Sequence, residues 1–384
     1  MSLPRVLFVN HTSQIAGAEL VLLDVVERWP GASAFLFEDG PLNEAMTSLG
    51  IRVIGSAWGR DLSRFRRDSS IWNAIPLAGR LGAISWEIGR AARECDVVYA
   101  NSQKSFVLAA VATAVCRRPL VWHLHDIIHR AHFGAMQRRI QIALANNRAT
   151  QVIVPSQAAA SAFIAEGGRR ALVRVVPNGV NVAPETQSGL QIRRELGLSE
   201  GPLVGVFSRL APWKGQHVVL AALAKLSGVN CIIAGDALFG EQAYAASLRD
   251  LAVKLGIADR VHFLGQRSDV TKLMQAVDVM VHPSVDPEPF GRTLVEAMFV
   301  KAPVIAADTG AASDILEGGA AGMLVTPNSP DELVAAITHV LSRPPDLGAR
   351  VEYAAARARK HYSVGTMREG ISSLIGQAAS EARA

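Results

Sequence analysis

The sequence of 384 residues is poor in cysteine, and the cysteines it has do not form a recognisable set. Cys95, Cys116 and Cys231 lie far apart and include no CxxC pair. This spacing indicates neither a zinc site nor a disulfide framework. Free thiols suit a reducing compartment, so we expect a cytoplasmic protein.

Long apolar runs are missing as well. The longest, around residues 106–115, is far below the ~18 residues that a membrane-spanning helix needs. Near the N-terminus the apolar residues 6–9 meet polar residues at once, so we expect no signal peptide and no membrane span. Charge of one sign is not in large excess either. The 39 Lys and Arg against 34 Asp and Glu leave +5, which is too mild to suggest nucleic acid as a partner.

A third absence concerns glycine. The loop after the first apolar run holds one glycine, Gly17, before a helical pattern begins, so the GxGxxG fingerprint of dinucleotide-binding folds is missing. An NAD-type function therefore loses its main support, and we expect no cofactor. What remains is a small-residue loop that leads into a helix N-terminus, where free amides favour an anion. Tight turns of small residues are also common in structure alone, so both interpretations stay open.

What the sequence does have is a regular alternation of short β-rich runs and longer helical patterns, which is typical of parallel sheets built from βαβ units. The expected strands cover residues 6–9, 34–37, 53–54, 97–99, 120–124, 152–154, 173–176, 203–207, 230–234, 261–264, 279–281, 304–306 and 323–325. The pattern is interrupted at the turn signal 177–179 and resumes after residue 202. We therefore expect an α/β chain of two doubly wound, Rossmann-like parallel-sheet domains that face a cleft. The first covers residues 1–182 and the second residues 183–361, and the tail is helical with a break at 362–363.

Ligands of doubly wound sheets bind beyond the carboxyl ends of the strands, so the residues that follow each run matter most. His125 lies at such an end, just after the strand expected over residues 120–124. There it can contact a ligand or merely cap the sheet, and the sequence leaves both open. No further metal-ligating residue lies at a convincing spacing from it, so we expect no metal site.

Two basic residues bracket the loop after the first strand of the second domain. Arg209 and Lys214 could both reach a phosphate over the strand ends, and a helix N-terminus follows them. The alternative is that both are solvated surface groups. The positive end of a helix is an unfavourable place for a lysine without an anion, which favours a phosphate site.

The most informative segment runs from Glu288 to Glu296 and joins a loop to a helix. Gly291 lets a ligand approach the backbone, and the amides from Gly291 to Leu294 would form an anion-binding helix start. A buried carboxylate suits a ribose diol because it accepts two hydrogen bonds, and Glu296 is the candidate. A helical glutamate on its own is usually solvated, but the surrounding residues favour function here.

Taken in order along the chain, these segments resemble the GT-B glycosyltransferases, and within them the retaining nucleotide-sugar transferases of family 4. The most specific likeness is the Glu-x7-Glu spacing of Glu288 and Glu296 together with Arg209 and Lys214-Gly215. The family usually has two glycines where this chain has Ala16-Gly17. The weaker matching pieces are Ala16-Gly17-Ala18-Glu19, His125-Asp126, 152–156, 177–180, Ala234-Gly235 and 263–265.

The resemblance implies a role for each matching residue. Arg209 and Lys214 would hold the donor diphosphate. Glu296 would bind the ribose, and Glu288 the hydroxyls of the transferred sugar. His125 would contact the sugar and its phosphate from the first domain, and Gly17 would line the phosphate side of the cleft. The expected catalytic residues are thus His125, Glu288, Arg209 and Lys214, and the expected donor-binding residues are Gly17, Arg209, Lys214, Glu288, Phe290, Gly291, Arg292, Thr293, Leu294 and Glu296.

The resemblance also implies an activity: retaining, metal-independent transfer of a hexose from a UDP- or GDP-sugar to a glycan or polyprenyl-linked acceptor in cell-envelope or exopolysaccharide synthesis. No acidic DxD motif stands out after a strand, which agrees with metal independence. No residue is an evident nucleophile, so we favour front-face attack with the leaving phosphate as the base. Residues 362–384 resemble the last helix of the family, which crosses back to the first domain.

Two alternatives share this architecture. A nucleotide-sugar 2-epimerase has the same two-domain form, but the intact Arg-x4-Lys-Gly and Glu-x7-Glu pairs favour transfer. A nucleotide-sugar-binding subunit without turnover would be expected to lose His125 or Glu288, and both are present. The choice of uridine or guanosine stays open because no residue is seen to read the base.

Positive charge gathers in the first half of the chain. Residues 1–180 hold 20 basic and 13 acidic side chains, a balance of +7, whereas the rest carries −2. We therefore expect the acceptor to bind here, together with peripheral contact with an anionic membrane on its inner face. A solvated arginine surface is the alternative. The candidate residues are Arg60, Arg64, Arg66, Arg67, Arg138 and Arg139.

Overall fold

The chain forms two compact units. The computed structural model describes residues 3–59, 74–130, 133–182, 189–198, 201–238 and 240–381. Unit 1 consists of residues 1–179 and 364–384, and unit 2 consists of residues 180–363. The sequence predicts divisions after residues 182 and 361.

Unit 1 is built on a sheet of seven parallel strands in the order β3-β2-β1-β4-β5-β6-β7. Most of its strands are apolar along their length because both faces of a parallel sheet are buried. This arrangement confirms the doubly wound sheet that the sequence predicts. The strands are β1 (Val6–Asn10), β2 (Ser33–Leu36), β3 (Arg52–Gly55), β4 (Val97–Ala100), β5 (Leu120–His123), β6 (Gln151–Val154) and β7 (Val173–Val175).

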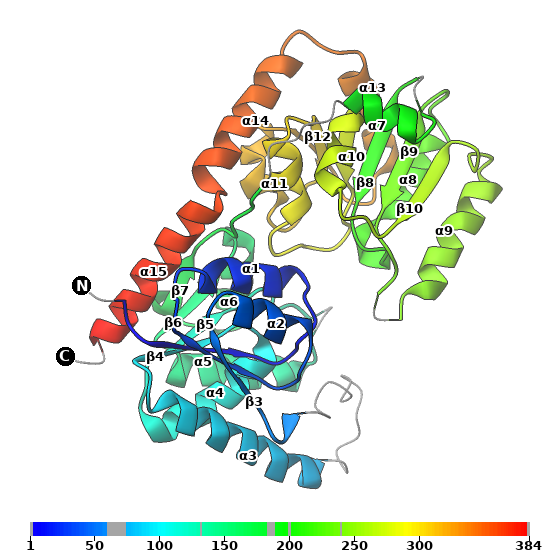
Figure 1. Cartoon of the computed structure of the whole chain (residues 1–384). Helices are drawn as coiled ribbons and strands as arrows, with labels where there is room; N and C mark the ends of the chain where they lie inside the picture. Colours follow the sequence, from blue (N-terminus) through cyan, green and yellow to red (C-terminus); the bar gives the residue numbers. More distant parts are fainter. Residues whose placement is uncertain are drawn as a thin grey trace. The chain divides into compact units, whose positions relative to one another are not determined.

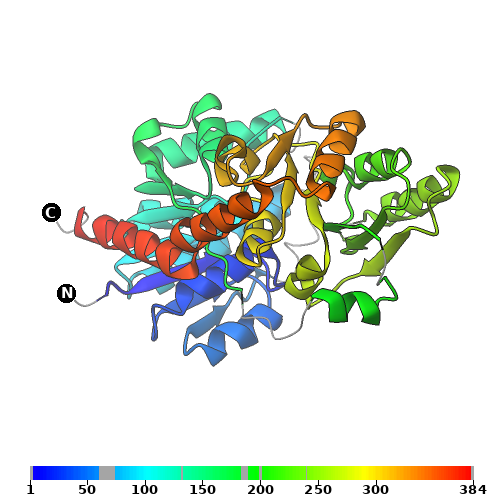
Figure 2. The same ribbon diagram turned by 90° about the horizontal axis from the view of Figure 1, so that it is seen from above.

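Helices cover both faces of this sheet (Figures 1 and 2). They are α1 (Gly17–Val26), α2 (Pro41–Ser48), α3 (Ala74–Ala92), α4 (Gln103–Cys116), α5 (Ala135–Arg148), α6 (Gln157–Ala165) and α15 (Val364–Glu381). Side chains alternate along each strand. In β1, Leu7 and Val9 join the core under α3, α4, α5 and α6, whereas Val6 and Phe8 join the core under α1, α2 and α15. The C-terminal helix is therefore part of the core of unit 1.

Unit 2 repeats the architecture with six parallel strands in the order β10-β9-β8-β11-β12-β13. The strands are β8 (Leu203–Phe207), β9 (Asn230–Ala234), β10 (Val261–Gly265), β11 (Val279–His282), β12 (Val304–Ala307) and β13 (Met323–Val325). Its helices are α7 (Gly189–Glu195), α8 (Gln216–Leu223), α9 (Gln242–Lys254), α10 (Val270–Ala276), α11 (Arg292–Phe299), α12 (Ala312–Ile315), α13 (Pro330–Leu341) and α14 (Leu347–His361). Val204 and Val206 of β8 pack under α8, α9 and α13, and Leu203 and Phe207 pack on the opposite face.

The chain passes from α14 of unit 2 to α15 of unit 1 through Tyr362 and Ser363, where the sequence predicts a break. In the part of the chain that the structure describes, no helix combines the length and the apolar character that crossing a bilayer requires.

Each sheet has one place where the connections of neighbouring strands run in opposite directions. In unit 1 it lies between β1 and β4, and in unit 2 between β8 and β11. Such a switch point opens a crevice at the carboxyl ends of its strands, and ligands of doubly wound sheets bind there. The loops that follow these four strands are therefore the places to look for a site.

Candidate functional site

The switch point of unit 2 gathers most of the residues that the sequence singles out. Arg209 and Lys214 follow β8, and Glu288 follows β11, its neighbour in the sheet. The amide of Val285 donates to the Trp213 carbonyl over 2.8 Å, so the two loops are fastened to each other. Residues far apart in the sequence thus meet at one edge of the sheet.

Gly215 lets these loops approach so closely. Its φ of +73° lies in the left-handed region, and a Cβ at this position would lie 1.9 Å from the Pro283 carbonyl oxygen. Only glycine fits such a backbone and such a contact. The Lys-Gly pair therefore has a structural explanation: the glycine brings the lysine beside the loop that carries Glu288.

Glu288 is the centre of a compact polar cluster. The Lys214 ammonium forms an ion pair with Oε1 of Glu288, and Lys214 as a residue is 8% exposed. His282 Nε2 lies 2.6 Å from Oε2, and the Ser284 hydroxyl donates to the same oxygen over 3.1 Å. Burial alone would raise the pKa of the Glu288 carboxyl, but Lys214 and His282 hold it well below its usual range. The site therefore keeps a buried carboxylate ionised.

Arg209 has a partner that the sequence analysis did not name. Its guanidinium lies 3.3 Å from a carboxylate oxygen of Glu241, at the start of α9. The Trp213 ring lies close to both basic groups, with Arg209 Cζ at 5.7 Å and Lys214 Nζ at 4.3 Å from its centroid. Both distances are within the range of cation–π attraction. Trp213 thus helps to hold both cations beside the strand ends.

The start of α11 offers amides and a second carboxylate. Gly291 precedes the helix with φ +84° and provides no side-chain cap. The Leu294 amide already donates to the Gly291 carbonyl over 3.0 Å, which leaves the amides of Arg292 and Thr293 for an anion. Arg292 pairs with Glu296 over 2.8 Å. Burial raises the pKa of the Glu296 carboxyl, and Arg292 offsets part of that effect.

Two residues of this segment belong mainly to the core. Phe290 is 4% exposed and packs edge-on against Tyr362, with ring centroids 5.9 Å apart. The Leu294 side chain is fully buried in the same cluster. These side chains therefore leave little surface for a donor, although the sequence places both in the donor site.

The switch point of unit 1 also carries a buried polar group. His125 Nε2 lies 2.9 Å from Oδ1 of Asn101, which follows β4. The Asn101 amide nitrogen lies 3.3 Å from the Ala18 carbonyl, so its oxygen is the atom that faces the histidine. His125 Nε2 therefore carries a hydrogen. Burial lowers the pKa of His125 to about 3, so the ring is neutral near pH 7.

The loop that carries Gly17 leads into the helix whose Ala18 carbonyl contacts Asn101, the partner of His125. The Asn10 amide donates to Oε1 of Glu19 over 3.2 Å, and the Glu19 Oε2 accepts from the Ala16 amide over 3.2 Å. Ala16 itself has no side-chain oxygen to cap α1. The first amides of the helix at Gly17 thus have no cap from this residue, as an anion-binding helix start requires.

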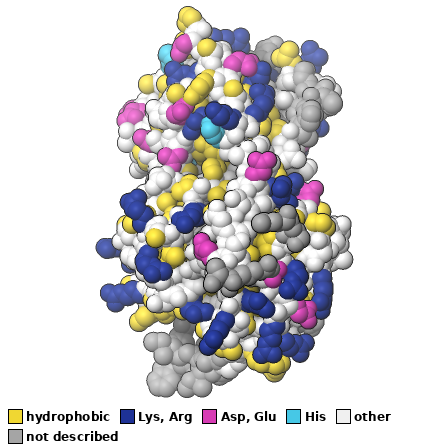
Figure 3. Space-filling view, turned by 90° about the vertical axis from the view of Figure 1, so that its left-hand side faces the viewer, with side chains coloured by type: hydrophobic (Ala, Val, Ile, Leu, Met, Phe, Trp, Pro, Cys, Tyr) yellow, Lys and Arg dark blue, Asp and Glu magenta, His cyan; other side chains and the backbone are white. Residues whose placement is uncertain are grey.

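The arginines expected to meet the acceptor are only partly placed. Arg138 forms an ion pair with Glu166 over 2.8 Å and donates to the Phe133 carbonyl, whereas Arg139 is exposed. Figure 3 shows Lys and Arg side chains spread over the surface of unit 1 at the bottom of the view. The remaining candidates, Arg60, Arg64, Arg66 and Arg67, lie outside the described residues.

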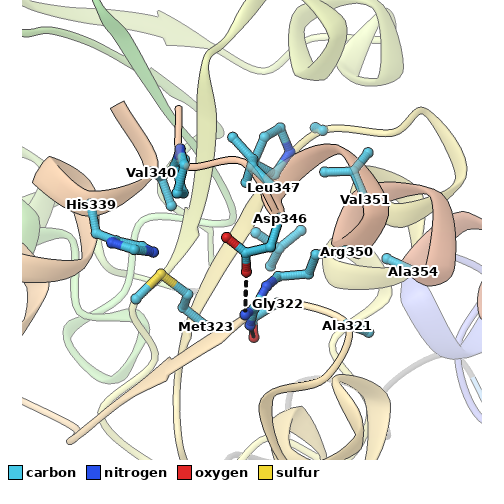
Figure 4. A pocket seen from close by; sticks show the side chains of 14 residues that line it. Ala321, Gly322, Met323, His339, Val340, Asp346, Leu347, Arg350, Val351 and Ala354 are labelled. Carbon is cyan, nitrogen blue, oxygen red and sulfur yellow. Dashed lines mark hydrogen bonds and ion pairs between the residues drawn. The ribbon is translucent and has the colours of Figure 1, made fainter. Parts of the chain in front are cut away.

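A small hollow in unit 2 lies at the amino ends of β12 and β13. Figure 4 shows Asp346 and Arg350 paired beside Met323, the first residue of β13. Its volume is about 10 Å³, whereas small-molecule pockets measure ~300–1,000 Å³. It is too small for a nucleotide. Elsewhere in the described ranges, no cluster of three or more His, Cys, Asp or Glu is arranged to hold a metal ion.

The sequence did not identify several residues that act as contact partners in these clusters. They are Asn10, Asn101, Trp213, Glu241, His282 and Ser284. A signal was available for His282, because it follows the strand expected over residues 279–281 as His125 follows the strand expected over residues 120–124. The contacts themselves join residues far apart in sequence, such as Lys214 and Glu288, and a single sequence does not show these.

Comparison with known families gives matches over both units. The description "Glycosyltransferase Family 4" fits residues 42–183, and "Glycosyl transferases group 1" fits residues 190–359. Over 177 residues the chain is 38% identical to D-inositol 3-phosphate glycosyltransferase of Mycobacterium marinum, covering 45% of this chain and 38% of that protein. It is 30% identical over 217 residues to the lipopolysaccharide core biosynthesis mannosyltransferase LpsB of Rhizobium meliloti, covering 53% of this chain and 62% of that protein. Each of these matches spans less than two thirds of the relative.

Solved structures match nearly the whole chain. Anabaena HepE in complex with UDP has a TM-score of 0.86 and 36% identity, covering 97% of this chain and 100% of that chain. HepE in complex with UDP-glucose has a TM-score of 0.85. A glycosyltransferase from Rickettsia africae, at 18% identity, has a TM-score of 0.80 over 98% of this chain and 99% of that one, and it supports the fold alone.

Proposed function

This chain belongs to the group 1 glycosyltransferases with the GT-B fold, and we propose that it transfers a hexose from a nucleoside diphosphate sugar to a glycan or polyprenyl-linked acceptor. The observation that carries the proposal is the cluster at the switch point of unit 2. There Lys214 pairs with the largely buried carboxylate of Glu288, and Arg209, which pairs with Glu241, lies in the same loop as Lys214. Cations that suit a diphosphate and a carboxylate that can accept hydrogen bonds from sugar hydroxyls thus lie in one place.

Each residue of the cluster has a part in donor binding. Arg209 and Lys214 neutralise the diphosphate, and the amides of Arg292 and Thr293 add the positive end of α11. Glu288 accepts a hydroxyl of the transferred sugar. Glu296 takes the ribose, since a carboxylate can accept both hydroxyls of a diol. In the structure the carboxylates of Glu288 and Glu241 balance the two cations.

We propose UDP-glucose as the first donor to examine. HepE, 36% identical to this chain over nearly its whole length, was crystallised with UDP and with UDP-glucose. The residues of unit 2 that would meet a diphosphate do not themselves distinguish uridine from guanosine. A GDP-linked hexose is therefore the second donor.

The charges of this site suit a mechanism without metal. When the bond from the anomeric carbon to the β-phosphate breaks, negative charge grows on the departing diphosphate, and Arg209 and Lys214 stabilise it there. The acceptor hydroxyl attacks from the side that the phosphate leaves and gives its proton to a phosphate oxygen. The configuration at the anomeric carbon is then retained. His125, neutral near pH 7, contributes hydrogen bonds rather than charge.

Unit 1 supplies the acceptor side in this proposal. Its positive balance suits a phosphate-linked lipid at the inner face of an anionic membrane, within cell-envelope or exopolysaccharide synthesis. Arg139 is the described member of the expected group that is exposed and not held by an ion pair. Binding to anionic vesicles that weakens steeply with salt supports this location. Absence of any vesicle binding at low salt contradicts it.

The proposed reaction is tested with purified chain, UDP-[13C]glucose and a polyprenyl-linked acceptor fraction, in excess EDTA. The expected result is an α-linked product from the α-linked donor, at a rate that EDTA does not change, and Lys214→Ala abolishes it. A β-linked product contradicts retention. Strict dependence on magnesium contradicts the metal-free mechanism.

A further inference from the structure

His282 is a buried polar residue of the site that the proposed function leaves without a role. It is the last residue of β11 and is 3% exposed. Its backbone is paired with Ala306 of β12, so the sheet fixes its position. A histidine held in this way can orient a neighbour because its own ring has little freedom to move.

All polar contacts of the ring point to the donor site. Nε2 lies 2.6 Å from Oε2 of Glu288 and 3.3 Å from the Ser284 hydroxyl. Nδ1 lies 3.3 Å from the Thr293 hydroxyl, in the first turn of α11. The imidazole thus joins the sugar-binding carboxylate to the phosphate-binding helix start.

The hydrogen-bond roles follow from the chemistry of the partners. An ionised carboxylate only accepts, so His282 Nε2 carries the hydrogen in this contact. Together with the Ser284 hydroxyl it fills both acceptor positions of Oε2. Lys214 fills one position of Oε1. One acceptor position of the carboxylate is therefore left, on Oε1, for a sugar hydroxyl.

We propose that His282 is a positioning residue for donor-sugar recognition: with Ser284 it holds the Glu288 carboxylate so that Oε1 meets a hydroxyl of the transferred hexose. This inference rests on the proposed function, because it assumes that Glu288 binds the sugar. It goes further because it proposes that the orientation of the Glu288 carboxylate is fixed by His282, a residue that touches neither phosphate nor sugar.

The chain offers a matched control in the same sheet. His262 of β10 is also a strand histidine, and its Nε2 has no hydrogen-bond partner among the described residues. His262→Leu therefore removes an imidazole without touching Glu288. His282→Gln keeps an N–H at a reach similar to that of Nε2, whereas His282→Leu removes it.

The experiment compares two probes, UDP and UDP-glucose, by titration calorimetry on each full-length variant. The affinity of UDP reports the phosphate site, and the ratio of the two affinities isolates the sugar contact. His282→Leu is expected to leave UDP affinity within about threefold, to weaken UDP-glucose about tenfold or more, and to lower kcat with it. His282→Gln restores most of the ratio, and His262→Leu leaves both affinities unchanged.

Two outcomes overturn the proposal. One is an equal loss of UDP and UDP-glucose affinity in His282→Leu, which indicates a merely structural role. The other is a His282→Leu ratio like that of His262→Leu. Failure of the unmodified chain to bind either probe contradicts the proposed function instead. In that case proton NMR of the free chain still tests the contact: a downfield His282 Nε2–H signal must disappear in Glu288→Ala, and its absence from the unmodified chain refutes the clamp.

Discussion

At the scale of single residues, Glu296 is a group whose burial costs stability. Burial raises the pKa of its carboxyl above the unfolded value, so its contribution to stability is greatest at low pH and is lost as pH rises through the folded pKa. Glu296→Gln is therefore expected to leave the melting temperature unchanged or higher. The same change should weaken the binding of UDP about tenfold or more, because the ribose hydroxyls lose a charged hydrogen-bond acceptor.

Calorimetry and thermal melts of Glu296→Gln check this pair of effects. Glu352→Gln, which removes an exposed partner of Lys301, serves as the control and should change neither quantity. UDP affinity unchanged in Glu296→Gln would remove the ribose role from this residue.

Trp213 supports a second prediction at this scale. Its ring holds Arg209 and Lys214 by cation–π contacts, each worth ~0.5–2 kcal/mol. Trp213→Leu should weaken the binding of UDP by about threefold to tenfold, whereas Trp213→Phe should retain most of the affinity for UDP. Titration of both variants with UDP checks the difference. Equal affinities in Trp213→Leu and Trp213→Phe would show that the ring does not act on the cations.

At the scale of elements, the approach of the loops after β8 and β11 depends on Gly215. In Gly215→Ala the added Cβ would meet the Pro283 carbonyl at 1.9 Å and would strain a φ of +73°. Gly256 has a similar φ of +67° but open space around it. Gly256→Ala should therefore cost only the backbone strain, ~1–2 kcal/mol, and Gly215→Ala more.

Denaturant unfolding of the two glycine variants measures that difference. Gly215→Ala, but not Gly256→Ala, is also expected to weaken the binding of UDP, because Lys214 moves with the loop. Equal free energies of unfolding in the two variants would mean that the close approach to Pro283 is not tight in solution.

The elements themselves are largely predictable from the sequence, for a physical reason. Strands of a parallel sheet are buried on both faces, so each is a short apolar run, as residues 203–207 of β8 illustrate. Helix ends are less predictable. α4 begins at Gln103, three residues before its apolar pattern at 106–115, because the Ser102 side chain caps it by accepting from the Ser105 amide.

The site is predictable to a smaller extent. Arg209, Lys214, Glu288 and Glu296 stand out because their spacing forms a recognisable pattern. Their partners do not stand out. Glu241 meets Arg209 only once β8 and β9 lie side by side in the sheet, and His282 meets Glu288 only once the loop after β11 folds back on the strand end.

At the scale of the whole molecule, one buried histidine, His123, and two partly buried ones, His11 and His125, make unit 1 sensitive to acid. Burial lowers the pKa of His11 to about 4 and of His125 to about 3, and burial lowers that of His123 as well. The unfolded chain binds these protons below pH ~6.5, whereas the folded unit does not until pH ~4. Stability therefore falls as pH decreases through this window, by up to ~4 kcal/mol per pH unit for three histidines.

Melting temperatures between pH 7.5 and 5 check this dependence. His11→Asn removes one of the three groups and should reduce the slope by about a third. A melting temperature that does not change between pH 7 and 5 would show that these rings do not stay neutral on folding.

The central claim for the whole molecule is that the switch point of unit 2 binds a nucleoside diphosphate sugar. Titration calorimetry with UDP, GDP, UDP-glucose and a GDP-linked hexose tests it most directly, in EDTA and at fixed salt. The account predicts one site per chain for a diphosphate, tighter binding of the matching sugar nucleotide, and loss of at least about tenfold in Lys214→Ala. Binding that Lys214→Ala leaves unchanged, or no binding of any of the four compounds, would contradict it.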